Sequence, residues 1–294
     1  MHPITTIIKS YHEKSTLRLS RNSKVGKTYK MGKTSVAQIR TSSGYPVATF
    51  RQLLDEVAFV TINNRNFEMF FRGQREDHKD RLKKTKIYPS IFRPLPGKKA
   101  VTRSLLEKRH YELHALINGA RADQGLIEKY SNDPFISFDE FHIAQFQHYG
   151  IVETPFIDIT QSLRVAASFA LRNSQEGYLY VFGLPYPNGS ISHFIDQQIV
   201  LVKLQNVSPV DAYRPRYQEG YLVGKFPITA SKEAGDNLAR RMIAKFKLEN
   251  SNGKFWDPDF TQIKDEILFP ENDQHEIFLE NLKRNTLPEF SAKR

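Results

Sequence analysis

The chain has 294 residues, and its 43 Lys and Arg against 32 Asp and Glu give a formal net charge of +11 at pH 7. This length is near the upper limit for a single hydrophobic core, so we expect one large domain with additions, or two domains. Hydrophobic residues make up 39% and charged residues 26%, as in ordinary globular proteins. Because the chain contains no cysteine, disulfides, thiolate zinc sites and cysteine nucleophiles are excluded.

The start of the chain does not resemble a targeting segment. Its short apolar stretch ends at Lys9 and is followed by the polar run Tyr11–Lys14, which is unlike a signal peptide. The longest helical apolar stretch, Val165–Leu171, is far below the ~20 residues of a membrane span. We therefore expect a soluble protein that is cytoplasmic and has no membrane partner.

The segment from Lys9 to Arg40 is strongly basic. It holds nine Lys and Arg residues and a single acid, Glu13. We expect residues 1–45 to form a basic N-terminal extension and residues 46–294 to form the globular body. Two interpretations of the extension stay open: a flexible or hairpin-forming arm that binds nucleic acid or another polyanion, or a solvated surface extension that packs on its own domain.

The first half of the body alternates between helical and extended patterns. Apolar spacing predicts a helix over residues 49–57 with Thr49 as its N-cap, and a buried aromatic strand over residues 67–74. A basic loop follows, and helical periodicity then covers residues 101–120. Residues 138–148 are predicted as a helix with Ser137 as N-cap, Glu140 as its capping-box partner and Gly150 beyond its end.

The second half contains more strands. We expect a strand over residues 156–160, an Ala-rich helix over 162–173, and strands over 178–183, 199–204 and 221–223. Residues 238–249 are predicted as a basic helix, and residues 275–284 as a final amphipathic helix. Because strands and helices do not alternate regularly, the α+β class is favoured over a doubly wound sheet.

A set of short motifs occurs in a fixed order along the chain. The set comprises Phe71-Arg72-Gly73-Gln74, Tyr88-Pro89-Ser90-Ile91-Phe92-Arg93, Gln147-His148-Tyr149-Gly150, Asp158-Ile159-Thr160, Gln218-Glu219-Gly220 and Leu268-Phe269-Pro270. In this order and spacing it resembles the FRG domain family, over roughly residues 67–282. Two positions depart from the family pattern: Pro155 stands where the family has Arg, and Ile159 where it has Trp.

The same residues show a more distant resemblance to ADP-ribosyltransferases. Arg72-Gly73 on a strand, Thr160 and Ser162 ahead of an Ala-rich helix, and Gln218-Glu219 ahead of a strand are similar to the arginine–serine–glutamate layout of that family. The resemblance implies a mixed, mostly antiparallel β core with flanking helices. It implies NAD or a related nucleotide as ligand, and transfer of ADP-ribose to a macromolecular acceptor or hydrolysis of NAD. Such an activity would suit a toxin-like effector in antiphage or interbacterial conflict.

The chemistry of NAD explains these residue types. A guanidinium fork binds a pyrophosphate or an adjoining ribose with two parallel hydrogen bonds, and a glycine beside it lets backbone approach a ligand closely. Loss of nicotinamide builds positive charge on the ribose, as in glycoside cleavage, and a nearby carboxylate stabilises that charge. The expected carboxylate position is occupied by Gly220, with Glu219 one residue earlier. A shift of one residue reverses the face on which a strand side chain lies, so the sequence leaves open whether Glu219 points toward a ligand or away from it.

The resemblances select twelve candidate site residues. The predicted catalytic residues are Arg72, His148, Asp158 and Glu219. The predicted cofactor-binding residues, besides Arg72, are Gly73, Gln74, Tyr88, Arg93, Tyr149, Thr160, Ser162 and Gln218.

Several of these residues also have a purely structural interpretation. A buried Arg72 needs either an internal carboxylate or a ligand. His148 at a helix end can simply interact with the last carbonyls, and Asp158 can cap the helix that follows it. Tyr88 before proline suits an ordinary turn, and Trp256 is predicted as a packing residue.

Two other functions remain open. One is a non-catalytic nucleic-acid or nucleotide-binding module that uses the basic N-terminal segment. The other is a metal-dependent nuclease, in which Glu153, Asp158 and Glu219 would supply carboxylates for Mg²⁺. No metal site is predicted from the histidines, because His110 and His114 lack the His-Glu-x-x-His order.

Overall fold

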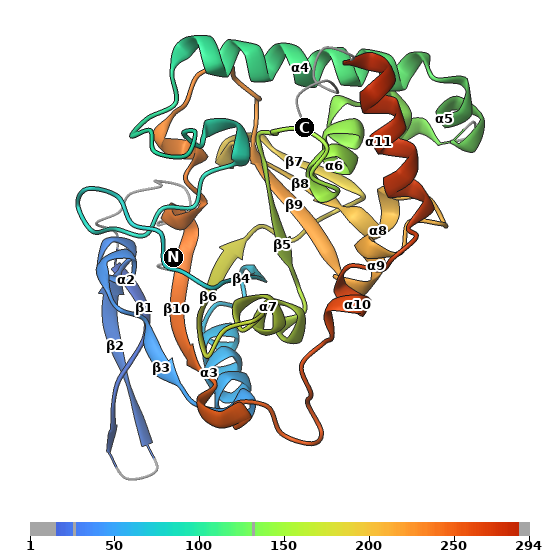
Figure 1. The fold of residues 1–294 in the computed structure, drawn as a ribbon. Coiled ribbons are helices and arrows are strands. Elements are labelled where there is room, and N and C mark those ends of the chain that lie inside the picture. Colours follow the sequence, from blue (N-terminus) through green and yellow to red (C-terminus); the bar gives the residue numbers. More distant parts are fainter. Residues whose placement is uncertain (1–15, 26–27, 131–132, 288–294) are drawn as a thin grey trace. The chain divides into compact units, whose positions relative to one another are not determined.

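The computed structural model describes residues 16–25, 28–130 and 133–287. The chain, drawn in Figure 1, divides into two compact units. The first comprises residues 1–87, 159–186 and 237–264, and the second comprises residues 88–158, 187–236 and 265–294. Helices and strands occur in both units, and most of the strand pairs among the described residues are antiparallel, so the predicted α+β class with a mostly antiparallel sheet is confirmed.

The first unit is built on neighbouring strands that run in the order β3-β10-β6-β4. Their bounds are β3 (Tyr45–Val47), β4 (Glu68–Gln74), β6 (Glu176–Leu184) and β10 (Met242–Glu249). The pair β3–β10 is parallel, whereas β10–β6 and β6–β4 are antiparallel. β4 also meets the end of β5 (Phe156–Thr160), where Phe71 lies opposite Thr160.

The basic N-terminal segment lies only partly within the described residues, since residues 1–15 and 26–27 fall outside them. The rest forms the antiparallel pair β1 (Thr16–Val25) and β2 (Thr28–Ser35), followed by the short helix α2 (Val36–Thr41). Ser35 caps α2 through a reciprocal pair of hydrogen bonds with Gln38.

Helix α3 (Phe50–Ile62) begins where the sequence predicts it. Thr49 accepts a hydrogen bond from the Gln52 backbone at 3.1 Å and so caps the first turn. Phe50 at the start of the helix stacks on Trp256 with a centroid distance of 5.2 Å. The prediction that Trp256 is a packing residue is confirmed.

Helix α7 (Leu163–Ala170) packs closely against β4 and β6, as Figure 1 shows. Two glycines permit this approach. A Cβ at Gly73 would lie 1.8 Å from the Ala166 carbonyl oxygen, and a Cβ at Gly177 would lie 2.2 Å from the Ala170 carbonyl oxygen. The small side chains on α7 and the glycines on β4 and β6 therefore allow the helix and the sheet to pack closely together.

The predicted basic helix over residues 238–249 is wrong. Residues Leu238–Arg241 form a 3₁₀ turn, and Met242–Glu249 form β10, which has a strand paired on each side. The prediction was a basic helix, but Lys245 and Lys247 alternate with apolar residues as a strand requires. The strand was hard to predict because Lys245, a residue type that usually faces solvent, has a fully buried side chain that pairs with Asp77.

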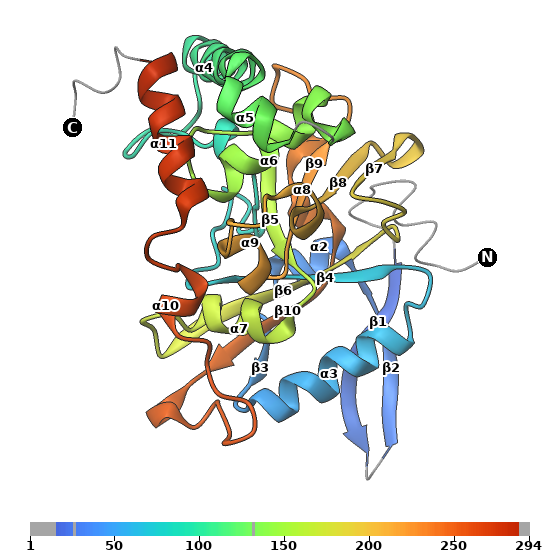
Figure 2. The ribbon, with the colours of Figure 1, turned by 90° about the vertical axis from the view of Figure 1, so that its right-hand side faces the viewer.

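The second unit contains strands in the order β9-β8-β7, and helices of the same unit pack against β8 and β9. Its strands are β7 (Ile191–Phe194), β8 (Ile199–Lys203) and β9 (Gly220–Lys225), all paired antiparallel. Its helices are α4 (Arg103–Ala122), α5 (Gln124–Lys129), α6 (Asp139–His148), α8 (Leu204–Val207), α9 (Arg214–Tyr217), α10 (Asp265–Leu268) and α11 (Gln274–Thr286). Helix α11 packs beside α4 (Figure 2), and both contribute to one apolar core.

The start of α6 differs from the prediction. Its N-cap is Phe138, which makes no side-chain cap bond, whereas Ser137 ends a preceding 3₁₀ turn and donates to the Pro134 carbonyl. That additional turn occupies the residue predicted as the cap. At the other end, Gly150 has the positive φ of 66° that favours glycine after a helix, as predicted.

In the part of the chain that the structure describes, every helix is too short or too polar to cross a lipid bilayer.

Candidate functional site

Asp158 on β5 is held by two side chains from the end of α6. Its Oδ2 accepts a hydrogen bond from Gln147 Nε2 at 2.7 Å, and its Oδ1 lies 3.2 Å from His148 Nδ1. Consecutive residues of one helix thus hold both oxygens of one carboxylate. This arrangement fixes the plane of the carboxylate before any ligand binds.

Gln147 is itself held in place. Its Oε1 accepts a short hydrogen bond from the Thr154 hydroxyl, while the Thr154 backbone N–H donates to Ser90 Oγ at 3.0 Å. The motif Tyr88–Arg93 is thereby joined to the motif Gln147–Gly150. We did not predict Gln147 or Thr154 as site residues, although Gln147 precedes His148 in the same motif.

His148 and Asp158 differ sharply in their access to solvent. The His148 side chain is 2% exposed, whereas the Asp158 side chain is 38% exposed. Burial lowers the pKa of His148 below its ordinary value, and the hydrogen bond and charge of Asp158 oppose this change. A neutral His148 donates from Nδ1 to the carboxylate, so Asp158 is the member of the pair that a ligand can reach.

Charged groups surround this pair within the second unit. Glu153 and Asp158 are the carboxylates that attract the Arg93 guanidinium, and Arg93 Nε donates to the Tyr88 carbonyl at 3.0 Å. The Tyr88 ring lies beneath Lys232, whose Nζ is 3.8 Å from the ring centroid. The structure therefore brings Tyr88, Arg93, His148 and Asp158 into one polar neighbourhood.

Arg72 belongs to a row of side chains in the first unit. It lies opposite Tyr180 on β6, which in turn lies opposite Lys245 on β10. Paired residues share a face of a sheet, so these three side chains lie on one face. Asp77 is also part of this row, because it accepts from the Tyr180 hydroxyl at 3.1 Å and from Lys245 Nζ at 2.9 Å.

The neighbours of Arg72 in sequence have packing roles. Gly73 permits the close approach of α7, and Gln74 ends β4 opposite Tyr178.

Thr160 and Ser162 lie at the start of α7. Thr160 Oγ accepts from the Ser162 backbone at 3.0 Å, and Ser162 caps the helix. Thr160 and Ser162 therefore shape the start of this helix.

Part of the chain that carries these residues matches a protein-family model. Residues 67–178 match the FRG domain family model, a range that includes Arg72, Arg93, His148 and Asp158. The FRG match covers this middle part of the chain and not its whole length. A search of curated proteins and a search of solved structures each gave no match.

The match confirms the resemblance to the FRG family over residues 67–178. The motifs at Gln218–Gly220 and Leu268–Pro270 lie beyond the matched FRG segment, yet they contact each other. Gln218 is buried and donates from Nε2 to the Leu268 carbonyl at 2.7 Å. Its amide thus ties the turn before β9 to the end of α10.

Glu219 lies at the turn before β9 and not within the strand. It has a positive φ of 46° and is exposed. The next residue, Gly220, begins β9, and a Cβ built on it would lie 3.5 Å from Cε1 of His148. The same Cβ would lie 2.7 Å from Leu204 Cδ1, so position 220 lies against Leu204 beside the His148 ring, and this chain has no carboxylate there.

Tyr149, a predicted binding residue, supports the structure of the second unit. Its hydroxyl donates to Asp273 Oδ2 at 2.9 Å, and the same oxygen accepts from the backbones of Tyr213 and Arg214. Asp273 Oδ1 caps α11 through the His275 backbone. Burial, together with Asp273, raises the pKa of Tyr149.

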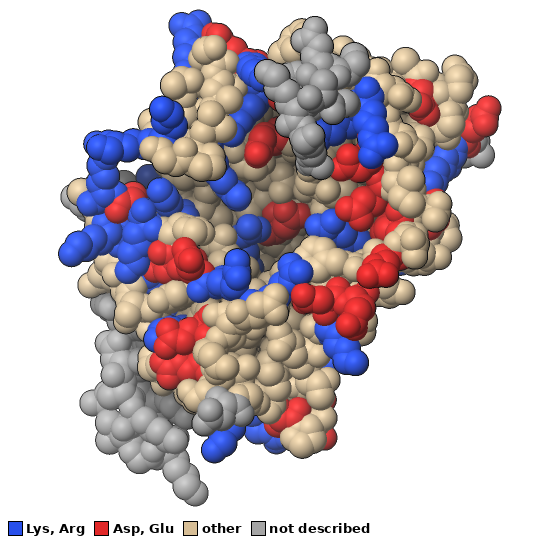
Figure 3. Space-filling view, in the orientation of Figure 1, with Lys and Arg blue, Asp and Glu red and all other residues tan. Residues whose placement is uncertain are grey.

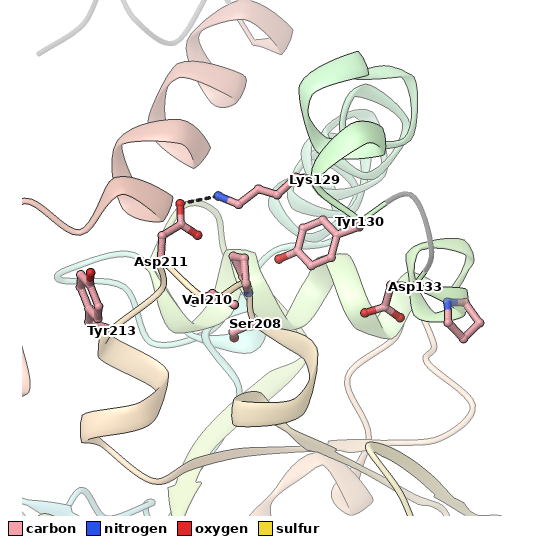
Figure 4. A pocket seen from close by; sticks show the side chains of 9 residues that line it. Lys129, Tyr130, Asp133, Ser208, Val210, Asp211 and Tyr213 are labelled. Carbon is pink, nitrogen blue, oxygen red and sulfur yellow. Dashed lines mark hydrogen bonds and ion pairs between the residues drawn. The ribbon is translucent and has the colours of Figure 1, made fainter.

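A cavity of about 640 Å³ lies elsewhere in the second unit. Figure 4 shows Lys129 reaching Asp211 above the Tyr130 ring, with an N–O distance of 2.6 Å. Burial raises the pKa of Tyr130, and the nearby Asp211 and Asp133 add to this effect. The cavity is lined by none of the twelve predicted residues: its walls are Lys129, Tyr130, Asp133, Pro134, Ser208, Pro209, Val210, Asp211 and Tyr213.

Within residues 16–25, 28–130 and 133–287, no group of three His, Asp or Glu side chains has an arrangement that would hold a metal ion.

Proposed function

We propose that this FRG-domain protein binds NAD or a related nucleotide and cleaves the bond between ribose and nicotinamide. ADP-ribose would then pass to a macromolecular acceptor or to water. The observation that carries the proposal is the oriented, solvent-accessible carboxylate of Asp158, held by Gln147 and His148. The resemblance to ADP-ribosyltransferases supports the choice of ligand.

The reaction requires stabilisation of positive charge. When the glycosidic bond breaks, its electron pair leaves with nicotinamide and the ribose becomes oxocarbenium-like. A carboxylate fixed beside C1′ stabilises this charge without reorganisation. The acceptor heteroatom, or water, then bonds to C1′ and loses its proton.

Asp158 suits this role better than Glu219. Glu219 precedes β9 at an exposed turn, whereas Asp158 is oriented through two hydrogen bonds. His148 is buried and acts on Asp158, so we assign it as a positioning residue. Arg93, which lies in the same unit as Asp158, is the guanidinium group that we propose for phosphate binding.

The proposal is tested with NAD labelled in the adenosine part, by following nicotinamide release and labelling of protein acceptors. Asp158→Asn keeps the shape of the side chain and removes its charge. We expect it to lower the rate about 100-fold or more, as loss of one electrostatic group does at an oxyanion-type site. The matched control Asp196→Asn, at an exposed position of the same unit, should keep the full rate.

Other variants assign the remaining roles. Glu219→Gln should keep most of the activity, and Arg93→Ala should weaken nucleotide binding in calorimetry. If the wild-type protein neither releases nicotinamide nor binds any adenine nucleotide, the proposal is refuted.

A further inference from the structure

The loop that follows β4 presents a dense group of cations. We define the basic loop as residues 75–86. Figure 3 shows Lys and Arg side chains gathered over it, on the left of the view. Its exposed cations are Arg75, Lys79, Arg81, Lys83 and Lys86, and Lys84 is half-buried.

Two of the three acids in the basic loop are engaged internally. Asp77 is 4% exposed and is bound by Lys245 Nζ at 2.9 Å, by the Thr85 hydroxyl at 2.6 Å and, from within the loop, by Lys79 Nζ at 3.6 Å. Asp80 Oδ1 accepts from the backbones of Leu82 and Lys84, and its Oδ2 lies 3.8 Å from Arg40. The surface of the loop is therefore more positive than its sequence indicates, with Glu76 as its one well-exposed acid.

The basic loop is also held in a defined shape. The Lys86 backbone donates to the His78 carbonyl at 2.8 Å, and the Thr85 backbone donates to the Arg40 carbonyl at 2.9 Å. Lys83, which has a positive φ of 57°, forms the turn with Asp80. Because the backbone is already ordered, binding a partner here costs less conformational entropy than ordering a free basic tail.

We propose that the basic loop binds the sugar–phosphate backbone of a nucleic acid. Ammonium and guanidinium groups pair with phosphates and release condensed counterions, a contribution that does not depend on base sequence. A lipid surface fits less well, since Leu82 is the one exposed large apolar side chain of the loop and a single aliphatic residue gives little insertion energy. The proposal does not depend on NAD chemistry at Asp158.

The test uses the full chain and a fluorescein-labelled 20-nucleotide single strand of thymidines. Binding is measured by fluorescence anisotropy between 20 and 300 mM salt. The loop variant combines Arg75→Gln, Arg81→Gln, Lys83→Gln and Lys86→Gln. The control variant removes four exposed cations from the second unit instead: Lys98→Gln, Lys99→Gln, Arg103→Gln and Lys108→Gln.

We expect the loop variant to bind about 10- to 100-fold more weakly at low salt. Each lost phosphate contact lowers the slope of log K against log salt by about 0.7 on a single strand, so the slope should fall by up to about 3. The control variant, with the same net charge, should keep most of the slope. Circular dichroism should show unchanged folding of both variants, because all eight positions are exposed.

Three results would overturn the proposal. The first is a loop variant that binds as well as the wild-type chain, which would move any binding to other cations such as those between Lys9 and Arg40. The second is an equal loss in both variants, which would indicate a general effect of net charge. The third is binding to vesicles rich in phosphatidylserine without binding to the oligonucleotide.

Discussion

Gly73 illustrates how one residue can serve a motif through packing. The sequence predicts a glycine that lets a ligand approach the backbone, but in the structure the close neighbour is the backbone of α7. The two roles make different demands, because a ligand can shift away from an added methyl group whereas a packed helix cannot.

We expect Gly73→Ala to destabilise the first unit by about 3 kcal/mol or more, because its Cβ would lie 1.8 Å from the Ala166 carbonyl oxygen. The free energy of unfolding is measured in urea through the fluorescence of Trp256, the single tryptophan, which lies in the same unit. The control Gly183→Ala, also on a strand of this unit, meets its nearest atoms at 3.5 Å and should change stability by less than about 1 kcal/mol. Equal stability of the two variants would contradict this explanation.

The candidate site was predicted unevenly, and the reason is visible at particular residues. His148 and Asp158 were predicted from motifs far apart in sequence, and the structure joins them through a hydrogen bond. The sequence could not predict which of the two side chains is exposed to solvent, because burial depends on how α6 and β5 pack. Glu219 was predicted as catalytic from its position before a strand, yet its positive φ, a property of the turn, sets its direction.

At the scale of elements, β10 shows where a sequence pattern fails. Both lysines were predicted on a basic helix, but they lie on a strand, where Lys247 is partly exposed and Lys245 is buried. A buried lysine requires a carboxylate from elsewhere in the chain, and Asp77 is 168 residues away in sequence. Thr49, by contrast, was predicted correctly as a cap because capping depends on residues within one helical turn.

We expect Lys245→Met to destabilise the first unit by about 3–5 kcal/mol, since it leaves the Asp77 carboxylate buried without its cation. Adding Asp77→Asn should recover part of this loss, and the double-mutant cycle in urea gives the coupling energy. Lys247→Met on the same strand is the control. Its ion pair with Glu176 is partly exposed, so a change of about 1 kcal/mol or less is expected. A cycle without coupling would mean that the pair does not fix the basic loop to β10.

Helix α11 depends on one buried carboxylate. Asp273 caps the helix with Oδ1 and accepts three further hydrogen bonds with Oδ2, including one from Tyr149. We expect Asp273→Ala to cost about 3 kcal/mol or more, because several buried donors lose a charged acceptor. Asp123→Ala, which removes the cap bond of α5 to the Leu126 backbone, should cost only about 1 kcal/mol. Urea unfolding followed by circular dichroism compares the two, and a smaller loss for Asp273→Ala would contradict the assigned role.

At the scale of the whole molecule, the surface charge depends on which cations are buried and which are exposed. The net charge of +11 does not by itself say which cations lie at the surface. In the structure, Lys245 lies inside the first unit, whereas Arg75 and Arg81 lie exposed on the basic loop. The burial of Lys245 therefore depends on Asp77, the acid that is buried beside it.

Buried histidines make the stability of the chain depend on pH. His275 is fully buried, and its Nε2 lies 3.0 Å from Gln145 Oε1. Burial, with a smaller contribution from Lys129, lowers the pKa of His275 to about 3. Burial also lowers the pKa of His148 and of His142, with their hydrogen-bond partners opposing the change.

The sign of the effect follows from proton binding. An unfolded histidine binds a proton below pH ~6.5, while folded His275 stays neutral down to about pH 3, so stability falls as the pH drops through this range. Between pH 7 and pH 5 His275 alone should cost about 2 kcal/mol of unfolding free energy. We expect His275→Gln, measured by urea unfolding and circular dichroism at both pH values, to reduce the pH dependence by this amount. His78→Gln, which removes an exposed ring, is the control and should leave the difference between the two pH values as in the wild-type chain. If His275→Gln keeps the full pH dependence, another group is responsible for the loss of stability in acid.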